Sequence, residues 1–318
     1  MEIRVLRYFL EVAREKNITK AAKHLHISQP TLSKQLKELE QELGKKLFVR
    51  SNYFIKLTEE GMLLKKRAEE ILELVDKTSD EFKALDEING GDIHIGCAES
   101  RDLQSFIQVL KKLQSNYPNI RFHLYSSATD AVDERLDSGL LDFAIIVQDV
   151  DSSKYNFLKI PASNKWGIIA RKDMPLAKKE KIKLEDLLDV PLICSRQSLQ
   201  ADLPKWLGDM QDKLNIIATY DLAYNASIMV REKMGYVLTF NHLIYTGEDS
   251  DLCFRPLEPA LESPMYIVWK KHQVFSPITS LLLKELQNTF GEKIWNMQII
   301  DSFKYFCYFD YSVFYYII

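Results

Sequence analysis

Residues Asn17–Gly44 read NITKAAKHLHISQPTLSKQLKELEQELG, and this stretch predicts two short helices joined by a tight turn. Thr19 is a candidate N-cap for the first helix, because a hydroxyl oxygen can accept one of the unpaired N–H groups at a helix start. Ser28 can do the same for the second helix, which opens with Gln29 and Pro30, and proline is favoured in a first helical turn. The layout is typical of a helix-turn-helix module.

One face of the second helix is apolar and the others are polar. Leu32, Leu36, Leu39 and Leu43 recur at spacings that place them on one buried stripe. The remaining side chains near the helix start carry the donors and acceptors that base edges and phosphates require. The candidate DNA-contacting residues are Thr19, Ser28, Gln29, Pro30, Thr31, Ser33, Lys34 and Lys37.

The next segment, KKLFVRSNYFIKL from Lys45 to Leu57, predicts two short strands around Ser51-Asn52. Such a pair would form a wing beside the helices and bring Arg50 near the backbone of a duplex. Residues 1–58 hold 12 lysines and arginines against 6 acids, a charge of +6, whereas the whole chain carries −3. The rest must therefore carry −9, and a basic module on an acidic body favours a polyanion partner for the N-terminal part alone.

Several short motifs at fixed offsets resemble the N-terminal signature of LysR-type transcriptional regulators. They are Ala21-Ala22, SQPTLS from Ser28 to Ser33, Leu39-Glu40, Leu43-Gly44, Leu47-Phe48 and LTEEG from Leu57 to Gly61. The resemblance implies a winged helix-turn-helix domain over residues 1–58, double-stranded DNA as a partner, and a role in transcription. It also implies that the chain works as a homodimer or homotetramer.

A long helix is predicted from Thr58 to about Asp86, within a linker over residues 59–89. Apolar residues on it alternate at steps of four and three, which indicates a seam that needs a partner helix. Packing on the chain's own body is the alternative to self-association. The candidate dimer contacts are Leu64, Ala68, Ile71, Val75 and Phe82.

Strand-like and helix-like segments alternate after a predicted hinge at Asn89-Gly90-Gly91, which indicates a mostly parallel α/β sheet. The family resemblance implies a two-lobed, periplasmic-binding-protein-like effector domain over residues 90–292. Lobe I would hold about 90–160 and 266–292, and lobe II about 161–265. An aromatic segment, 293–318, follows and predicts an irregular tail.

The cleft of such a domain is expected beyond the carboxyl ends of its strands, where helix N-termini meet a ligand. Ser100 matches the position at which the family places a Ser or Thr on its effector, and an anionic effector is the favoured hypothesis. Glu99 leaves a neutral or cationic one open. The candidate effector-binding residues are Ser100, Ser127, Thr129, Ser195 and Ser198.

Other functions lack support in the sequence. The chain has no phosphate-cradling glycine loop, no HExxH and no GxSxG, so no catalytic residue or cofactor is predicted. Its six histidines show no metal-like cluster, and its four scattered cysteines predict reduced thiols in the cytoplasm, with redox sensing as the remote alternative. No signal peptide or membrane span is predicted. The rival interpretation is a cytoplasmic small-molecule-binding protein or enzyme on the two-lobed fold.

Overall fold

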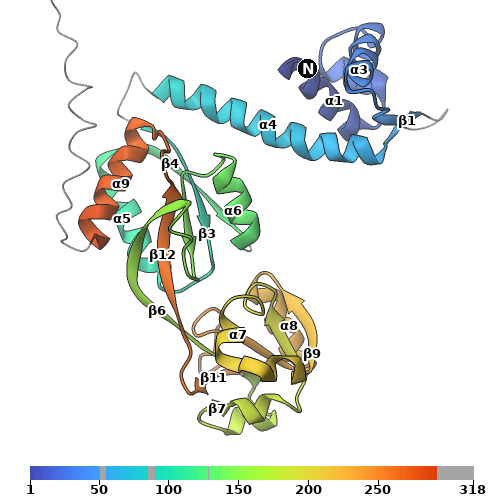
Figure 1. Cartoon of the computed structure of the whole chain (residues 1–318). Coiled ribbons are helices and arrows are strands. Elements are labelled where there is room, and N and C mark those ends of the chain that lie inside the picture. The colour runs from blue at the N-terminus through green and yellow to red at the C-terminus, as the bar shows by residue number, and fades with distance from the viewer. Residues whose placement is uncertain (51–54, 85–89, 128, 292–318) are drawn as a thin grey trace, which may run out of the picture.

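The computed structural model describes residues 1–50, 55–84, 90–127 and 129–291. Figure 1 shows a small helical module, one long helix and two α/β lobes, arranged in that order along the chain. This arrangement confirms the predicted fold class, a winged helix-turn-helix followed by a two-lobed domain. The predicted tail, 293–318, and the predicted wing tip lie outside the described residues.

The N-terminal module packs three helices and a two-stranded wing around one apolar core. Its elements are α1 (Ile3–Glu15), α2 (Ile18–His24), α3 (Gln29–Leu43), β1 (Phe48–Arg50) and β2 (Ile55–Leu57). Phe9, Leu32 and Leu36 are almost fully buried in this core. Leu43 departs from the predicted stripe because it lies at the helix end and is 38% exposed.

The first predicted helix cap is wrong by two residues. Asn17, not Thr19, caps α2, because its side-chain oxygen accepts a hydrogen bond from the Lys20 N–H at 3.0 Å. Lys16 ends α1 in the left-handed conformation, which leaves Asn17 extended and directly before the new helix. Ser28 caps α3 as predicted, accepting from the Thr31 N–H at 3.2 Å.

Helix α4 (Glu59–Ala84) begins within the core of the N-terminal module. Leu64, Ala68 and Ile71, predicted to face a second copy, pack on the module of their own chain, and Ala68 is fully buried there. The first half of the apolar stripe is therefore used internally, which corrects the predicted contact set. Val75 is half-buried, whereas Phe82 is 69% exposed.

Lobe I combines β3 (Gly90–Cys97), α5 (Leu103–Asn116), β4 (Asn119–Ser126), α6 (Thr129–Asp137), β5 (Phe143–Ile146) and α9 (Pro277–Phe290). Strand β3 pairs in parallel with both β4 and β5, as the alternating pattern predicts. Gly90 and Gly91, predicted as a hinge, instead open β3 and pair with Asn119 and Ile120.

Lobe II is joined to lobe I by two long strands, β6 (Tyr155–Arg171) and β12 (Glu262–Lys270), as Figure 1 shows. Its other elements are β7 (Ile182–Lys183), β8 (Leu192–Ser195), α7 (Asp202–Leu207), β9 (Ile216–Tyr220), α8 (Ala223–Arg231), β10 (Tyr236–Phe240), β11 (Leu252–Glu258) and the short 3-10 helices Pro175–Lys178, Leu184–Leu187 and Gly208–Lys213. Strand β6 pairs with β12 in lobe I and with β10 and β11 in lobe II. One sheet therefore runs through both lobes.

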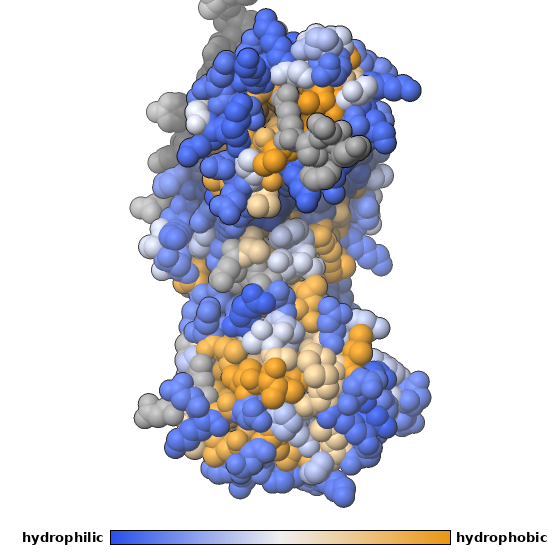
Figure 2. Space-filling view, turned by 90° about the vertical axis from the view of Figure 1, so that its right-hand side faces the viewer, coloured by the Kyte–Doolittle hydropathy of each residue, from blue (hydrophilic) through white to orange (hydrophobic). Residues whose placement is uncertain are grey.

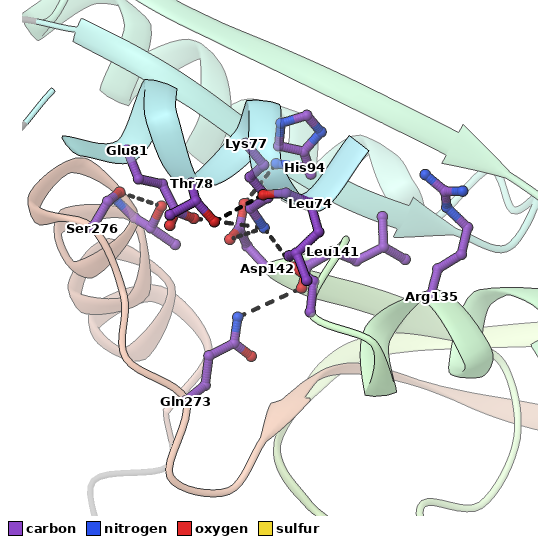
Figure 3. A network of polar contacts seen from close by, with 12 residues as sticks. Leu74, Lys77, Thr78, Glu81, His94, Arg135, Leu141, Asp142, Gln273 and Ser276 are labelled. Atoms are coloured by element: carbon purple, nitrogen blue, oxygen red, sulfur yellow. Dashed lines mark hydrogen bonds and ion pairs between the residues drawn. The ribbon is translucent and has the colours of Figure 1, made fainter. Parts of the chain in front are cut away.

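Helix α4 is fixed to lobe I by a buried ion pair, drawn in Figure 3. The Lys77 ammonium lies 2.8 Å from the Asp142 carboxylate, and both side chains are more than nine-tenths buried. Lys77 also donates to the Gly139 carbonyl at 3.1 Å, while Asp142 accepts from the His94 backbone N–H at 2.7 Å. Each buried charge thus has hydrogen-bonding partners, which is the condition for burying it at all.

Among the described helices, none combines the length and the apolar character needed to span a membrane.

Candidate functional site

The start of α3 presents exposed polar side chains on the surface of the N-terminal module. Gln29, Pro30 and Thr31 are exposed, and Ser33 is half-buried behind them. The Gln29 amide donates to the Ser33 hydroxyl at 2.8 Å, so these two side chains lie together along the helix. Donors and acceptors one turn apart on an exposed helix face can reach adjacent base pairs in a major groove.

Basic side chains extend this surface along α3. Lys34 and Lys37 are both exposed, and the Lys34 ammonium lies 3.8 Å from the Glu38 carboxylate. Thr19 is exposed in the first turn of α2. The Arg50 backbone ends strand β1, but its side chain lies outside the described residues.

Glu40 anchors the wing to α3, a role that the sequence analysis did not detect. Its carboxylate accepts from the Leu47 N–H at 2.9 Å and the Phe48 N–H at 3.4 Å, and Lys46 donates to it at 2.8 Å. Burial alone would raise the pKa of Glu40, but these hydrogen bonds lower it below its ordinary value. The signal was present in the sequence as an acid at a position that helical periodicity places beside Leu36 and Leu39.

A His–Glu–Glu group corrects the expectation that the histidines form no metal-like cluster. The Nδ1 atom of His24 lies 3.0 Å from the Glu11 carboxylate and 3.4 Å from that of Glu15, across the α1–α2 contact. Arg14 pairs with the same two acids, at 2.6 and 3.5 Å. An arginine already balances these carboxylates, so the group acts as an ionic contact between helices.

A cavity of about 70 Å³ lies between the lobes, where the carboxyl ends of β3 and β5 face lobe II. Ser127, Ser195 and Ser198, three of the predicted effector-binding residues, line it. The other lining residues are Ala98, Glu99, Val147, Trp166, Gln197, Asp202, Tyr220, Asp221, Leu222, Ala223, Thr239, Phe240 and Leu243.

Ser100 is not among the residues that line the cavity. Its hydroxyl donates to the Asn164 side-chain oxygen and accepts from the Asp102 N–H at 3.0 Å. Asn164 belongs to β6, so the predicted ligand contact is instead engaged with a strand that crosses between the lobes. Thr129 starts α6, and its side chain lies outside the described residues.

Hydrogen bonds between described residues of the two lobes cross the cleft. The Glu99 carboxylate of lobe I accepts from the Ala223 N–H at 3.0 Å, at the start of helix α8 in lobe II. The Gln197 amide of lobe II donates to the Gln148 side-chain oxygen of lobe I at 2.9 Å. The lobes are therefore held together by the chain's own side chains.

The described cysteines are poor candidates for redox sensing. Cys97, Cys194 and Cys253 are buried free thiols. Burial raises the pKa of Cys97 and of Cys194 to about 12, and it also raises the pKa of Cys253. Because the thiolate is the reactive form, these thiols are chemically quiet at neutral pH. Cys307 lies outside the described residues.

The chain has a winged helix-turn-helix, one connecting helix and a two-lobed domain with a cavity between the lobes. This combination defines a class of regulators that carry a DNA-binding module and a ligand-binding domain on one chain. Comparison with protein families identifies the family within that class. Residues 3–62 match the bacterial regulatory helix-turn-helix model of the lysR family, and residues 87–291 match the LysR substrate binding domain. The chain belongs to the LysR family of transcriptional regulators.

Two curated relatives and one solved structure illustrate the similarity. The chain is 34% identical over 197 residues to the uncharacterized regulator YwbI of Bacillus subtilis and 30% identical over 194 residues to the dual regulator OxyR of Escherichia coli. These segments cover 62% and 61% of this chain, and 65% and 63% of the relatives. Full-length CbnR, solved with its target DNA, shares the fold at a TM-score of 0.70 and 21% identity, over 91% of this chain and 100% of CbnR.

Replacing Glu40 with alanine tests the wing anchor. The change leaves the Leu47 N–H without its buried acceptor, at a cost of about 1–3 kcal/mol. The Leu47 and Phe48 amides should then exchange hydrogen faster than in the parent, while Glu38→Ala on the exposed face of α3 should leave them unchanged. Equal exchange in the two variants would contradict the anchor.

The lowered pKa of Glu40 also fixes the sign of its pH dependence. Its contribution is fully present above the ordinary pKa of an unfolded glutamate and is lost as the pH falls through the lower folded-state pKa.

Proposed function

We propose that the chain binds double-stranded DNA through the exposed start of α3 and responds to a small molecule in the inter-lobe cleft. The observation that carries the proposal is the serine-capped, exposed and polar start of α3 on a basic module. A regulator of this kind acts in the bacterial cytoplasm, where the chromosome lies, and as a binding protein rather than an enzyme.

The DNA interface would combine contacts to base edges with contacts to phosphates. Gln29 offers the amide that recognises adenine through two hydrogen bonds, and Ser33 adds a hydroxyl beside it. Lys34 and Lys37 supply charge to phosphates or to guanine, without the two-pronged geometry of arginine. Ser28 and Thr31 serve chiefly to start the helix, since their hydroxyls bond to each other at 2.7 Å.

Self-association would use the part of α4 that its own chain leaves uncovered. Phe82 is 69% exposed and Val75 half-buried on the stripe that continues beyond the N-terminal module. Figure 2 shows further apolar surface on lobe II, which exposes Ile217, Leu222 and Ile228. We take this exposed apolar surface as the candidate interface with a second copy. A dimer would present two copies of α3 to two half-sites.

An effector would act by favouring one arrangement of the two DNA modules. It can do so only if it binds the two arrangements with different affinities. The cavity is lined from both lobes, so a ligand there would change their closure. Lobe I also holds α4 through the Lys77–Asp142 ion pair. Helix α4 would thereby connect the cleft to the DNA module.

Gln29→Ala tests DNA reading. The variant should lose about 1–3 kcal/mol of discrimination at one base pair of an operator selected from random duplexes. Gln41→Ala, an exposed change near the far end of α3, should keep the parent's preference. Competition binding of operator against scrambled duplex gives the affinity ratio, and an unchanged ratio for Gln29→Ala would refute the assignment.

Phe82→Glu tests assembly. A charge at this position would be buried without a partner in a dimer, at a cost of several kcal/mol. Sedimentation should therefore show a weaker dimer for Phe82→Glu. Val274→Glu introduces the same charge at a side chain that is 94% exposed and should behave as the parent. An identical oligomer for both variants would exclude this part of α4 from the interface.

A further inference from the structure

We propose that the ligand of the inter-lobe cleft is a small organic cation, an ammonium group on a short apolar or aromatic body. This inference rests on the proposed function, since it takes the cleft to be the effector site and names the chemical class that the cleft selects. It replaces the anionic effector that Ser100 suggested, because Ser100 does not line the cavity.

The described walls of the cavity are acidic. Three acids line the cavity, namely Glu99, Asp202 and Asp221, while its described lining contains neither lysine nor arginine. Arg196 lies outside the lining, where its guanidinium is 3.7 Å from the Asp221 carboxylate and both side chains are more than half exposed. An exposed pair of this kind is weakened by solvent, so the described lining itself stays acidic.

The place where an anion would ordinarily bind already holds a carboxylate of the chain itself. Unpaired N–H groups at a helix N-terminus attract anions, and α8 points its first residue into this cavity. The Glu99 carboxylate already accepts the Ala223 N–H there at 3.0 Å. An anionic ligand would have to displace this internal carboxylate and then sit beside it and two further acids.

The remaining wall of the cavity is aromatic. Trp166 and Phe240 line the cavity and contact each other edge to face, with ring centroids 4.4 Å apart. Tyr220 adds a third ring, whose hydroxyl is occupied by the Leu238 carbonyl at 2.7 Å. Aromatic rings attract cations through their faces and accept an apolar body. A volume of about 70 Å³ limits the ligand to a small molecule.

The test uses ligands that share one carbon skeleton and differ in charge. The full-length protein is titrated with benzylamine, benzyl alcohol and benzoate, and with butylamine, 1-butanol and butyrate, at a fixed ionic strength. Thermal unfolding and calorimetry report binding, since a ligand that binds the folded state raises the Tm. An amine in at least one set should bind about tenfold or more tightly than its alcohol and its carboxylate.

Charge-removing variants assign that binding to the cleft. Glu99→Gln keeps a side-chain oxygen that can accept the Ala223 N–H, so it removes charge with little change of shape. It should weaken the amine about tenfold and leave the alcohol unaffected. Glu180→Gln makes the same change at an exposed position outside the cavity and should bind as the parent.

Tighter binding of a carboxylate or an alcohol than of the amine would overturn the cation proposal, as would the absence of a Tm shift with amines at about 10 mM. Equal amine binding by Glu99→Gln and the parent would also overturn it. None of these results bears on operator recognition by α3, so failure of the ligand class remains distinguishable from failure of the proposed DNA binding.

Discussion

The burial of Lys77 against Asp142 is the constraint on which the arrangement of the domains depends. A buried charge is tolerated only when it is paired and hydrogen-bonded. Removing one partner leaves the other charge buried and unpaired, at the full cost of its desolvation. Helix α4 therefore cannot slide along lobe I without separating these two groups. The same helix starts inside the core of the DNA module, where Ala68 and Leu72 are buried. One rigid helix thus joins both parts. Burial first, and then the Lys77 charge, lower the pKa of the neighbouring His94.

The strands of lobe I connect this joint to the cleft. Asp142 directly precedes β5, and the residue that follows β5, Val147, lines the inter-lobe cavity. Strand β3 likewise passes through His94 at the joint and ends at Cys97, and the next two residues, Ala98 and Glu99, line the cavity. Two hydrogen-bonded strands therefore span the distance between the inter-lobe cavity and the helix that joins lobe I to the DNA module.

Local patterns predicted most of the fold. The Ser28 cap, the apolar stripe of α3 and the alternation of strands and helices depend on residues close together in sequence. The first half of β6 is hard to predict from local pattern, because it mixes Lys159, Pro161 and Asn164 with apolar residues and pairs with a strand far away in the sequence. The sites were predicted less well. Ser100 takes its role from Asn164, a residue far away in the sequence, and Lys77 and Asp142 are 65 positions apart. The role of Glu40 depends on nearby residues, Leu47 and Phe48, but it requires the wing to fold back on α3.

The unfolding free energy of Lys77→Ala shows most clearly whether a buried ion pair fixes α4 on lobe I. The matched control is Lys66→Ala, which removes an exposed pair between the same helix and Glu134 of lobe I, at 3.2 Å. We expect Lys77→Ala to lose about 3–5 kcal/mol and Lys66→Ala less than about 1 kcal/mol in urea unfolding. Equal losses for the two variants would contradict this role of the ion pair.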